Sequence, residues 1–108
     1  MKKTALLFFI ALSFIGAGCT SYNSEHLNQF NRGSGSWNQW RRANPAVRPN
    51  LAGVKFYRKN FVGYNLQGVN FRDAELGFCT FTKLNLSGAN FEKAYLQGAR
   101  FTDVLLAN

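Results

Sequence analysis

The chain has 108 residues, and its 13 Lys or Arg against 5 Asp or Glu give a formal net charge of +8 at pH 7. This length accommodates one domain. One histidine and five carboxylates offer neither a metal-ligand cluster nor a paired acid and base, so we expect no catalytic site, no cofactor and no metal.

Residues 1–18 are typical of a secretory signal peptide. Lys2 and Lys3 give a positive start, residues 5–15 form an apolar run, and residues 16–18 close it with small side chains. The run is shorter than the roughly 20 residues that a membrane-spanning helix needs. We therefore expect a signal helix that is removed from the mature protein.

Cys19 follows the small residues directly, and this placement resembles the lipobox of bacterial lipoproteins. Ala17 and Gly18 match that pattern, whereas Gly16 stands where the family most often has Leu. The resemblance implies that Cys19 becomes the mature N-terminus and carries fatty acyl chains such as palmitate. Two or more chains, at about 0.8 kcal/mol per buried CH2, anchor a protein stably to a membrane.

The residue after this cysteine favours one membrane. Inner-membrane lipoproteins often carry Asp where this chain has Thr20, so the resemblance implies the outer membrane, facing the periplasm. The alternative is an ordinary cleavage site, after which Cys19 and Cys79 are free to form a disulfide. If Cys19 is lipidated instead, we expect Cys79 to be a small buried hydrophobic residue.

Residues 19–48 have the composition of a flexible basic linker, rich in Ser, Asn, Gln, Gly and Arg. Two short helices fit inside it, one beginning near Ser24 and one near Ser36. Pro45 and Pro49 end any helix before the next region begins.

Trp37, Trp40, Arg41 and Arg42 form the one cluster in the linker that has the chemistry of a binding site. Alternating Trp and Arg stack on bases or lie at an anionic lipid surface. A cap is the favoured interpretation, because the first turn of a repeat stack has an apolar end that needs a cover, and a loose solvated tether is a further alternative. His26 has no second ligand at metal spacing.

Every fifth residue from Leu51 to Leu106 is Leu or Phe. The positions are Leu51, Phe56, Phe61, Leu66, Phe71, Leu76, Phe81, Leu86, Phe91, Leu96, Phe101 and Leu106. A period of five fits neither a helix facing a core nor an ordinary strand, so the repeat itself is the structural unit.

The residues around these centres resemble the pentapeptide-repeat family, whose pattern is Ala, then Asp or Asn, then Leu or Phe, then two freer positions. Residues 65–68 read Asn-Leu-Gln-Gly, residues 85–88 read Asn-Leu-Ser-Gly, and residues 89–91 read Ala-Asn-Phe. The resemblance covers residues 49–108. It implies an all-β fold, a right-handed quadrilateral β-helix of about three coils with twenty residues in each.

Residues twenty apart test this register, because they stack on one side of such a coil. The large inward residues Tyr64 and Leu84 fall in one column, and stacked Asn columns predict a ladder of amide hydrogen bonds. Opposite charges also align, in the pairs Lys55 with Glu75, Arg72 with Glu92, Asp73 with Lys93, and Lys83 with Asp103. Lys59 is the misfit, a charge at an inward position.

The last coil is predicted to be a dimer end. No helix follows it in the sequence, so unpaired backbone groups beside Leu96, Phe101 and Leu106 form a template for pairing. We expect a homodimer with a two-fold axis at this joint.

The predicted function is that of a non-catalytic, lipid-anchored cell-envelope protein whose solenoid is a protein-interaction or structural module with an unknown envelope partner. Residues 49–108 hold seven Lys or Arg against four Asp or Glu, unlike the acidic, DNA-imitating rods of quinolone-resistance relatives. The basic surface favours anionic lipid head groups or cell-wall polymers, with no nucleic acid partner. The alternative is a cytoplasmic accessory or antagonist protein that binds an enzyme such as a topoisomerase.

Overall fold

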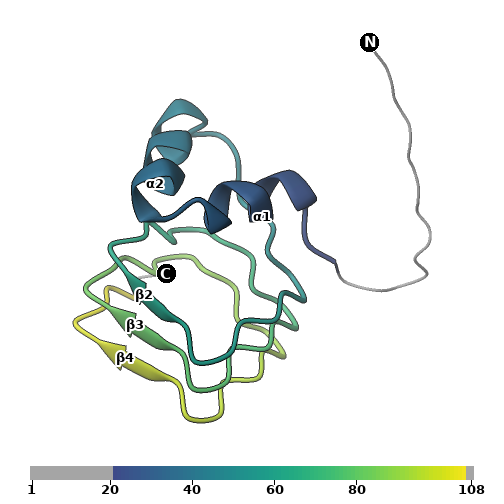
Figure 1. The fold of residues 1–108 in the computed structure, drawn as a ribbon, viewed down its shortest axis with the longest axis vertical. Helices are drawn as coiled ribbons and strands as arrows, with labels where there is room; N and C mark the ends of the chain where they lie inside the picture. The colour runs from purple at the N-terminus through teal and green to yellow at the C-terminus, as the bar shows by residue number, and fades with distance from the viewer. Residues whose placement is uncertain (1–20, 107–108) are drawn as a thin grey trace.

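The computed structural model describes residues 21–106, which form two helices followed by a stack of irregular turns (Figure 1). The helices are α1 (Ser24–Asn31) and α2 (Ser34–Ala43), and the strands are β2 (Asn60–Val62), β3 (Thr80–Thr82) and β4 (Arg100–Thr102). The helices lie at one end of the stack and β4 at the other (Figure 1). The predicted signal peptide and Cys19 lie outside the described residues.

All backbone pairing in the stack is parallel and joins residues twenty apart. In the sheet of order β2-β3-β4, Phe61 pairs with Phe81 and Phe81 with Phe101. Bridges outside the strands repeat this spacing: Asn50 to Asn70 to Asn90, Lys55 to Glu75 to Tyr95, and Asn65 to Asn85 to Leu105. The predicted twenty-residue register is confirmed, and the fold is β-helix-like.

The Leu and Phe centres point inward and form the core. Phe61, Phe71 and Phe81 are fully buried, as are the Leu centres of the first two turns. Aromatic rings stack from turn to turn, with ring centroids 4.9 Å apart for Phe61 and Phe81 and 4.7 Å apart for Phe81 and Phe101. Stacked pairs of this kind add stability beyond the area that they bury.

Two inward positions hold residues other than the usual small apolar ones, Cys79 and Lys59. Cys79 is a free, fully buried thiol whose Sγ donates to the Phe56 carbonyl at 3.4 Å, and burial raises its pKa. The prediction of a small buried hydrophobic residue is confirmed. Lys59 is half-buried, and its Nζ lies 5.7 Å from the centroid of the Phe56 ring, where the face of the ring attracts the cation.

Each corner of the coil requires a left-handed residue two positions after a centre. Positive φ occurs at every fifth residue from Gly53 to Asp103, with values between 54° and 78°. Glycine adopts this conformation freely, whereas other residues do so at a cost. The pattern therefore explains why Gly recurs at this position, and it makes Arg58, Phe78 and Lys93 locally strained.

The Asn residues before the centres mostly bond within their own turn. One bond of the predicted amide ladder is present, from Asn70 Nδ2 to Asn50 Oδ1 at 3.3 Å. The Oδ1 atoms of Asn50, Asn65, Asn70, Asn85 and Asn90 each accept the backbone N–H two residues later. The ladder prediction is wrong for the steps from Asn70 to Asn90 and from Asn65 to Asn85, because a carbonyl aimed at its own corner closes a local turn.

Two of the four predicted charge pairs form. Lys55 Nζ lies 3.9 Å from the Glu75 carboxylate, and Arg72 pairs with Glu92. Asp73 instead lies 3.7 Å from Arg72 Nε. Within residues 21–106 the pairs Asp73 with Lys93 and Lys83 with Asp103 do not form, and all four of these residues occupy left-handed corners.

The two helices expected near Ser24 and Ser36 are present as α1 and α2, so residues 24–43 are ordered and do not form a flexible linker. Asn23 caps α1 by accepting the His26 N–H at 3.0 Å, and Phe30 and Trp37 are fully buried. Apolar burial against the first turn supplies the stability that short isolated helices lack. Among residues 21–106, neither helix has the length and apolar character needed to cross a membrane.

The backbone conformation predicts opposite effects for two glycine substitutions, one at a left-handed corner and one inside a helix. Gly63→Ala should lower the free energy of unfolding by about 1–2 kcal/mol, because φ is +78° and only Ser34 Oγ, at 4.0 Å, would meet the new Cβ. Gly35→Ala, inside α2 with open space around it, should raise it by about 0.5–1 kcal/mol. Urea unfolding measures both, and equal midpoints would contradict the corner geometry.

Candidate functional site

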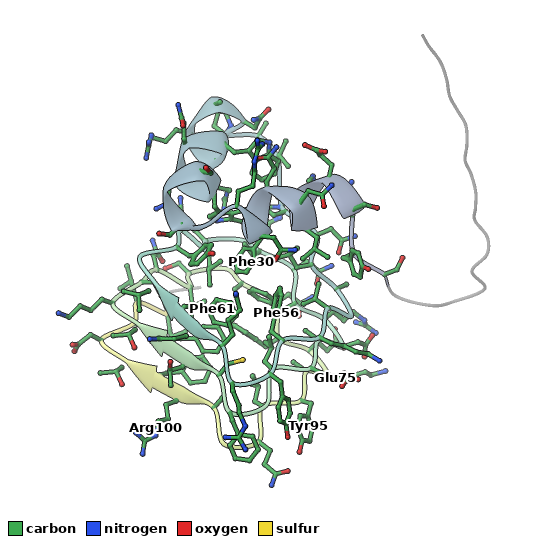
Figure 2. The ribbon with its side chains drawn as sticks, viewed as in Figure 1. Phe30, Phe56, Phe61, Glu75, Tyr95 and Arg100 are labelled. Carbon is green, nitrogen blue, oxygen red and sulfur yellow. The ribbon has the colours of Figure 1, made fainter. Side chains whose placement is uncertain are left out.

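The two helices cover the open end of the first turn through a cluster of aromatic rings. Phe30 descends from α1 toward Phe56 and Phe61 (Figure 2), with ring centroids 5.3 Å and 5.6 Å away. Its ring also stacks on Tyr64 at 4.4 Å and meets Trp37 edge-on at 5.1 Å. The end of the apolar core is thereby removed from water.

Asn38 of α2 takes the place that a neighbouring turn would occupy on the backbone. Its Oδ1 accepts the Asn65 N–H at 2.7 Å, and its Nδ2 donates to the Gly63 carbonyl at 2.7 Å. One side-chain amide thus presents the donor and acceptor that a peptide group of another turn would present. Edge groups that water or another chain would otherwise satisfy are paired here.

Trp37 and Arg41 pair further carbonyls of the same edge. Trp37 Nε1 donates to the Asn65 carbonyl at 2.7 Å, and Arg41 Nη1 donates to the same oxygen at 2.9 Å. Arg41 Nη2 donates to the Gln67 carbonyl at 2.8 Å. Burial, and secondly the positive charge of Arg48, lower the pKa of Arg41.

A second contact joins the start of α1 to Asn50. The Asn23 N–H donates to the Asn50 carbonyl at 3.0 Å, and the Asn50 N–H donates to His26 Nδ1 at 3.0 Å. The histidine therefore serves as a hydrogen-bond acceptor in its neutral form. Burial lowers the pKa of His26, and the neighbouring Glu25 opposes that shift.

The structure brings together three of the four residues singled out in the linker. Trp37 is buried, Trp40 packs beside it with ring centroids 5.2 Å apart, and Arg41 lies 5.9 Å from the Trp37 ring centroid. Arg42 is exposed on the outer side of α2. Sequence reasoning missed Asn38, for which no local signal exists, because its partners lie 25 and 27 residues away.

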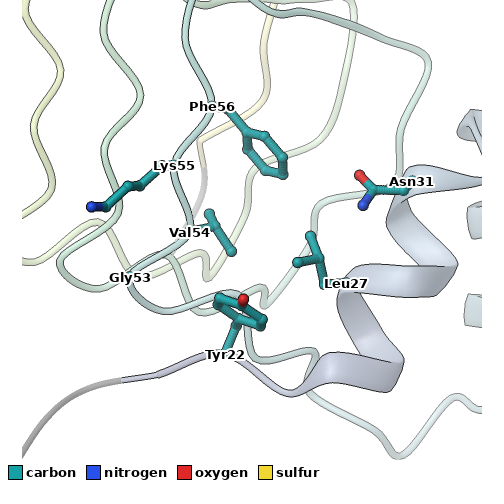
Figure 3. A pocket seen from close by; sticks show the side chains of 7 residues that line it. All are labelled: Tyr22, Leu27, Asn31, Gly53, Val54, Lys55 and Phe56. Carbon is teal, nitrogen blue, oxygen red and sulfur yellow. The ribbon is translucent and has the colours of Figure 1, made fainter.

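A cavity of about 390 Å³ lies between α1 and the first turn (Figure 3). Its apolar wall is made by Leu27, Val54 and Phe56, and its rim by Tyr22 and Lys55. Its lining holds no carboxylate, and residues 21–106 contain no cluster of metal-ligating side chains.

The opposite end of the stack exposes apolar side chains. Leu96 is half-buried, Phe101 is 39% exposed, and Leu106 is 61% exposed, with Leu105 beside it at 57%. The equivalent centres of the first two turns are buried, except Phe56, which is partly buried. The predicted dimer-end residues therefore lie in the last turn, where apolar side chains are exposed.

The paired contacts of Asn38 predict a large effect from a very small change. Asn38→Asp should lower the free energy of unfolding by about 1–3 kcal/mol, because the Gly63 carbonyl loses its donor. The matched control is Gln39→Glu, the same change of charge one residue away at an exposed position, which should stay within about 0.5 kcal/mol. Equal urea midpoints for the two variants would contradict the role of Asn38.

The neutral state of His26 predicts a loss of stability in mild acid. Because its pKa is below 6.5 in the folded protein, the unfolded chain binds the proton first as the pH falls. Stability from this group is complete above about pH 6.5 and declines below it. Urea midpoints measured between pH 8 and 5 should fall more steeply for the natural protein than for His26→Gln. Parallel pH profiles would show that the contact with Asn50 does not depend on protonation.

Comparison with known proteins identifies the repeats but no close relative. Residues 70–108 match the family model described as pentapeptide repeats, in 8 copies. None of the curated proteins matches the chain.

One solved structure is similar in sequence pattern, a pentapeptide repeat protein (Rfr23) from the cyanobacterium Cyanothece 51142. The two are 24% identical over 56% of this chain and 45% of that chain, with a TM-score of 0.27. The aligned part is thus less than half of that protein's length. The match over residues 70–108 agrees with the period of five found along residues 49–108.

Proposed function

We propose that this protein is a non-catalytic, lipid-anchored envelope protein whose repeat stack is a protein-interaction module. Pentapeptide repeats are commonly such modules and are generally not enzymes. The observation that carries the proposal is the difference between the two ends of the stack. The first turn has its core and edge groups covered by α1 and α2, whereas Phe101 and Leu106 are exposed on the last.

In this proposal α1 and α2 form an N-terminal cap on a right-handed quadrilateral β-helix of about three coils. Phe30 and Trp37 fill the apolar end, and Asn38 and Arg41 satisfy the edge. Burial of Trp37 supports the cap over the surface-binding interpretation, because a fully buried ring offers no face to a ligand. The anchor is Cys19, in the outer membrane and facing the periplasm.

The exposed last turn is proposed to join a second copy of the chain. A two-fold joint at this end covers Leu96, Phe101 and Leu106 on both copies at once. The apolar side chains supply burial, and backbone groups at the edge supply pairing.

Lipid anchoring predicts that one cysteine determines the location of the protein. The natural chain should fractionate with outer membranes and incorporate a labelled fatty acid, and Cys19→Ser should abolish the incorporation. Cys79→Ser is the matched control, because the Cys79 thiol is buried and free. Full-length, unlabelled protein in the soluble cytoplasm would refute the anchor and support the alternative of an accessory or antagonist protein acting on a cytoplasmic enzyme.

The dimer predicts that a charge at the last turn separates the copies. Sedimentation should give a dimer for the natural chain and a monomer for Leu106→Lys, because each copy would bury a lysine at the joint. Val62→Lys, an equally drastic change at an exposed position on the side of the stack, should leave the dimer intact. A monomer at high concentration of the natural chain contradicts the joint without affecting the anchor.

A further inference from the structure

A groove runs along one side of the stack, next to the cap residue Arg41, which donates a hydrogen bond to the Gln67 carbonyl. Its volume is about 460 Å³, and it is lined by Arg48, Gln67, Gly68, Asn85, Ser87, Gly88 and Leu105. These residues come from successive levels of the coil, because Asn65 pairs with Asn85 and Asn85 with Leu105. Two steps of about 4.8 Å make the lined stretch roughly 10 Å long.

The floor of the groove is backbone. Gly68 and Gly88 occupy left-handed corners one above the other, and a Cβ added to Gly88 would lie 3.8 Å from the Gly68 Cα. Because Gly88 carries no side chain, a ligand can approach the backbone there closely, whereas the Arg48 guanidinium lies over Gly68. The two glycines therefore occupy the same left-handed position that recurs at every fifth residue of the coil.

The polar side chains on the walls have unused hydrogen-bonding groups. Within residues 21–106, the Gln67 amide, Asn85 Nδ2 and Ser87 Oγ have no hydrogen-bond partner, and only Asn85 Oδ1 is engaged, by the Ser87 N–H. An amide supplies both donors and acceptors, and a hydroxyl does the same. This set matches a ligand that carries many hydroxyl groups.

One end of the groove is positively charged and uncompensated. The Arg48 guanidinium lies over Gly68, with its Cζ 3.7 Å from where a Cβ on that glycine would stand. Arg48 and Arg41 form no ion pair within the part of the chain that the structure describes, and their charges repel each other. The other residues that line the groove are Gln, Asn, Ser, Gly and Leu, and none of them is a carboxylate. A bound anion would relieve the repulsion between the two guanidinium groups.

We propose that this groove binds an anionic glycan, with an acidic group of the polymer on Arg48 and its hydroxyls on Gln67, Asn85 and Ser87. The groove is elongated and its walls carry the amides of Gln67 and Asn85, which fits a linear sugar chain. A nucleic acid would need exposed rings for its bases, and the groove has none. A lipid head group would bind Arg48 and leave the amides of Gln67 and Asn85 without hydrogen-bond partners.

The experiment measures binding of oligogalacturonate, a sugar chain with a carboxylate on each residue, to the full chain in detergent micelles. Isothermal titration should show binding that falls about tenfold or more for Arg48→Gln, because a charge-assisted hydrogen bond is lost. The matched control is Arg100→Gln, which removes the same charge from an exposed position on β4 and should change affinity less than twofold. Maltooligosaccharide of equal length, which is neutral, should bind at least tenfold more weakly.

A second pair of variants keeps the test decisive if Arg48→Gln loses stability. Ser87→Glu places a negative charge in the groove and should abolish binding, whereas Thr102→Glu adds that charge on β4 and should weaken binding only slightly. Equal losses for Arg48→Gln and Arg100→Gln, or equal losses for the two Glu variants, would overturn the proposal in favour of general charge attraction. Tighter binding to anionic vesicles or single-stranded DNA, lost with Arg48→Gln, would also overturn it. None of these outcomes depends on lipidation of Cys19, and sedimentation of each variant shows whether a change in binding accompanies a change in the dimer.

Discussion

Each turn of this coil is held by the peptide groups of the next, and so the stack cannot satisfy its own two ends. Inside it, the N–H of Asn70 bonds to the Pro49 carbonyl and the N–H of Asn90 to the Val69 carbonyl, twenty-one residues back in each case. The first turn has no earlier turn to provide these partners. Buried peptide groups without partners are costly, so what lies on the ends determines whether the stack forms.

At the first turn, side chains of α1 and α2 replace the missing neighbouring strand as hydrogen-bond partners of the backbone. Asn38 offers a complete amide, Arg41 a forked donor and His26 a ring nitrogen, and together they pair groups on two sides of the turn. Each helix is short, and its two faces differ: one fills the apolar opening with Phe30 or Trp37, and the other meets water. Helix formation and closure of the stack therefore depend on each other.

The sequence predicted the repeating part well because each unit repeats a local rule. The period of five, the inward Leu and Phe, the twenty-residue register and the burial of Cys79 all follow from the order of residues. The cap was harder to predict. The sequence indicated two short helices and a cap but not their contacts, because the apolar surface that orders them is created only when residues 51–66 have coiled. Asn38 and His26 gain their roles from partners more than twenty residues away, which no local pattern records. Two of the four predicted surface charge pairs form, since register sets which residues align but does not fix where exposed side chains point.

The Asn38 contact also limits how the length of this protein can change. Inserting a whole turn of twenty residues after the first coil would return the chain to the same side, so the cap would still meet Gly63 and Asn65, and the glycine column would gain another member. Inserting one pentad before Asn65 would instead rotate every later column by a quarter turn and present the amide with the wrong edge. The cap therefore constrains the length of the first coil, where a single inserted pentad would break its contacts, and leaves the number of later turns free.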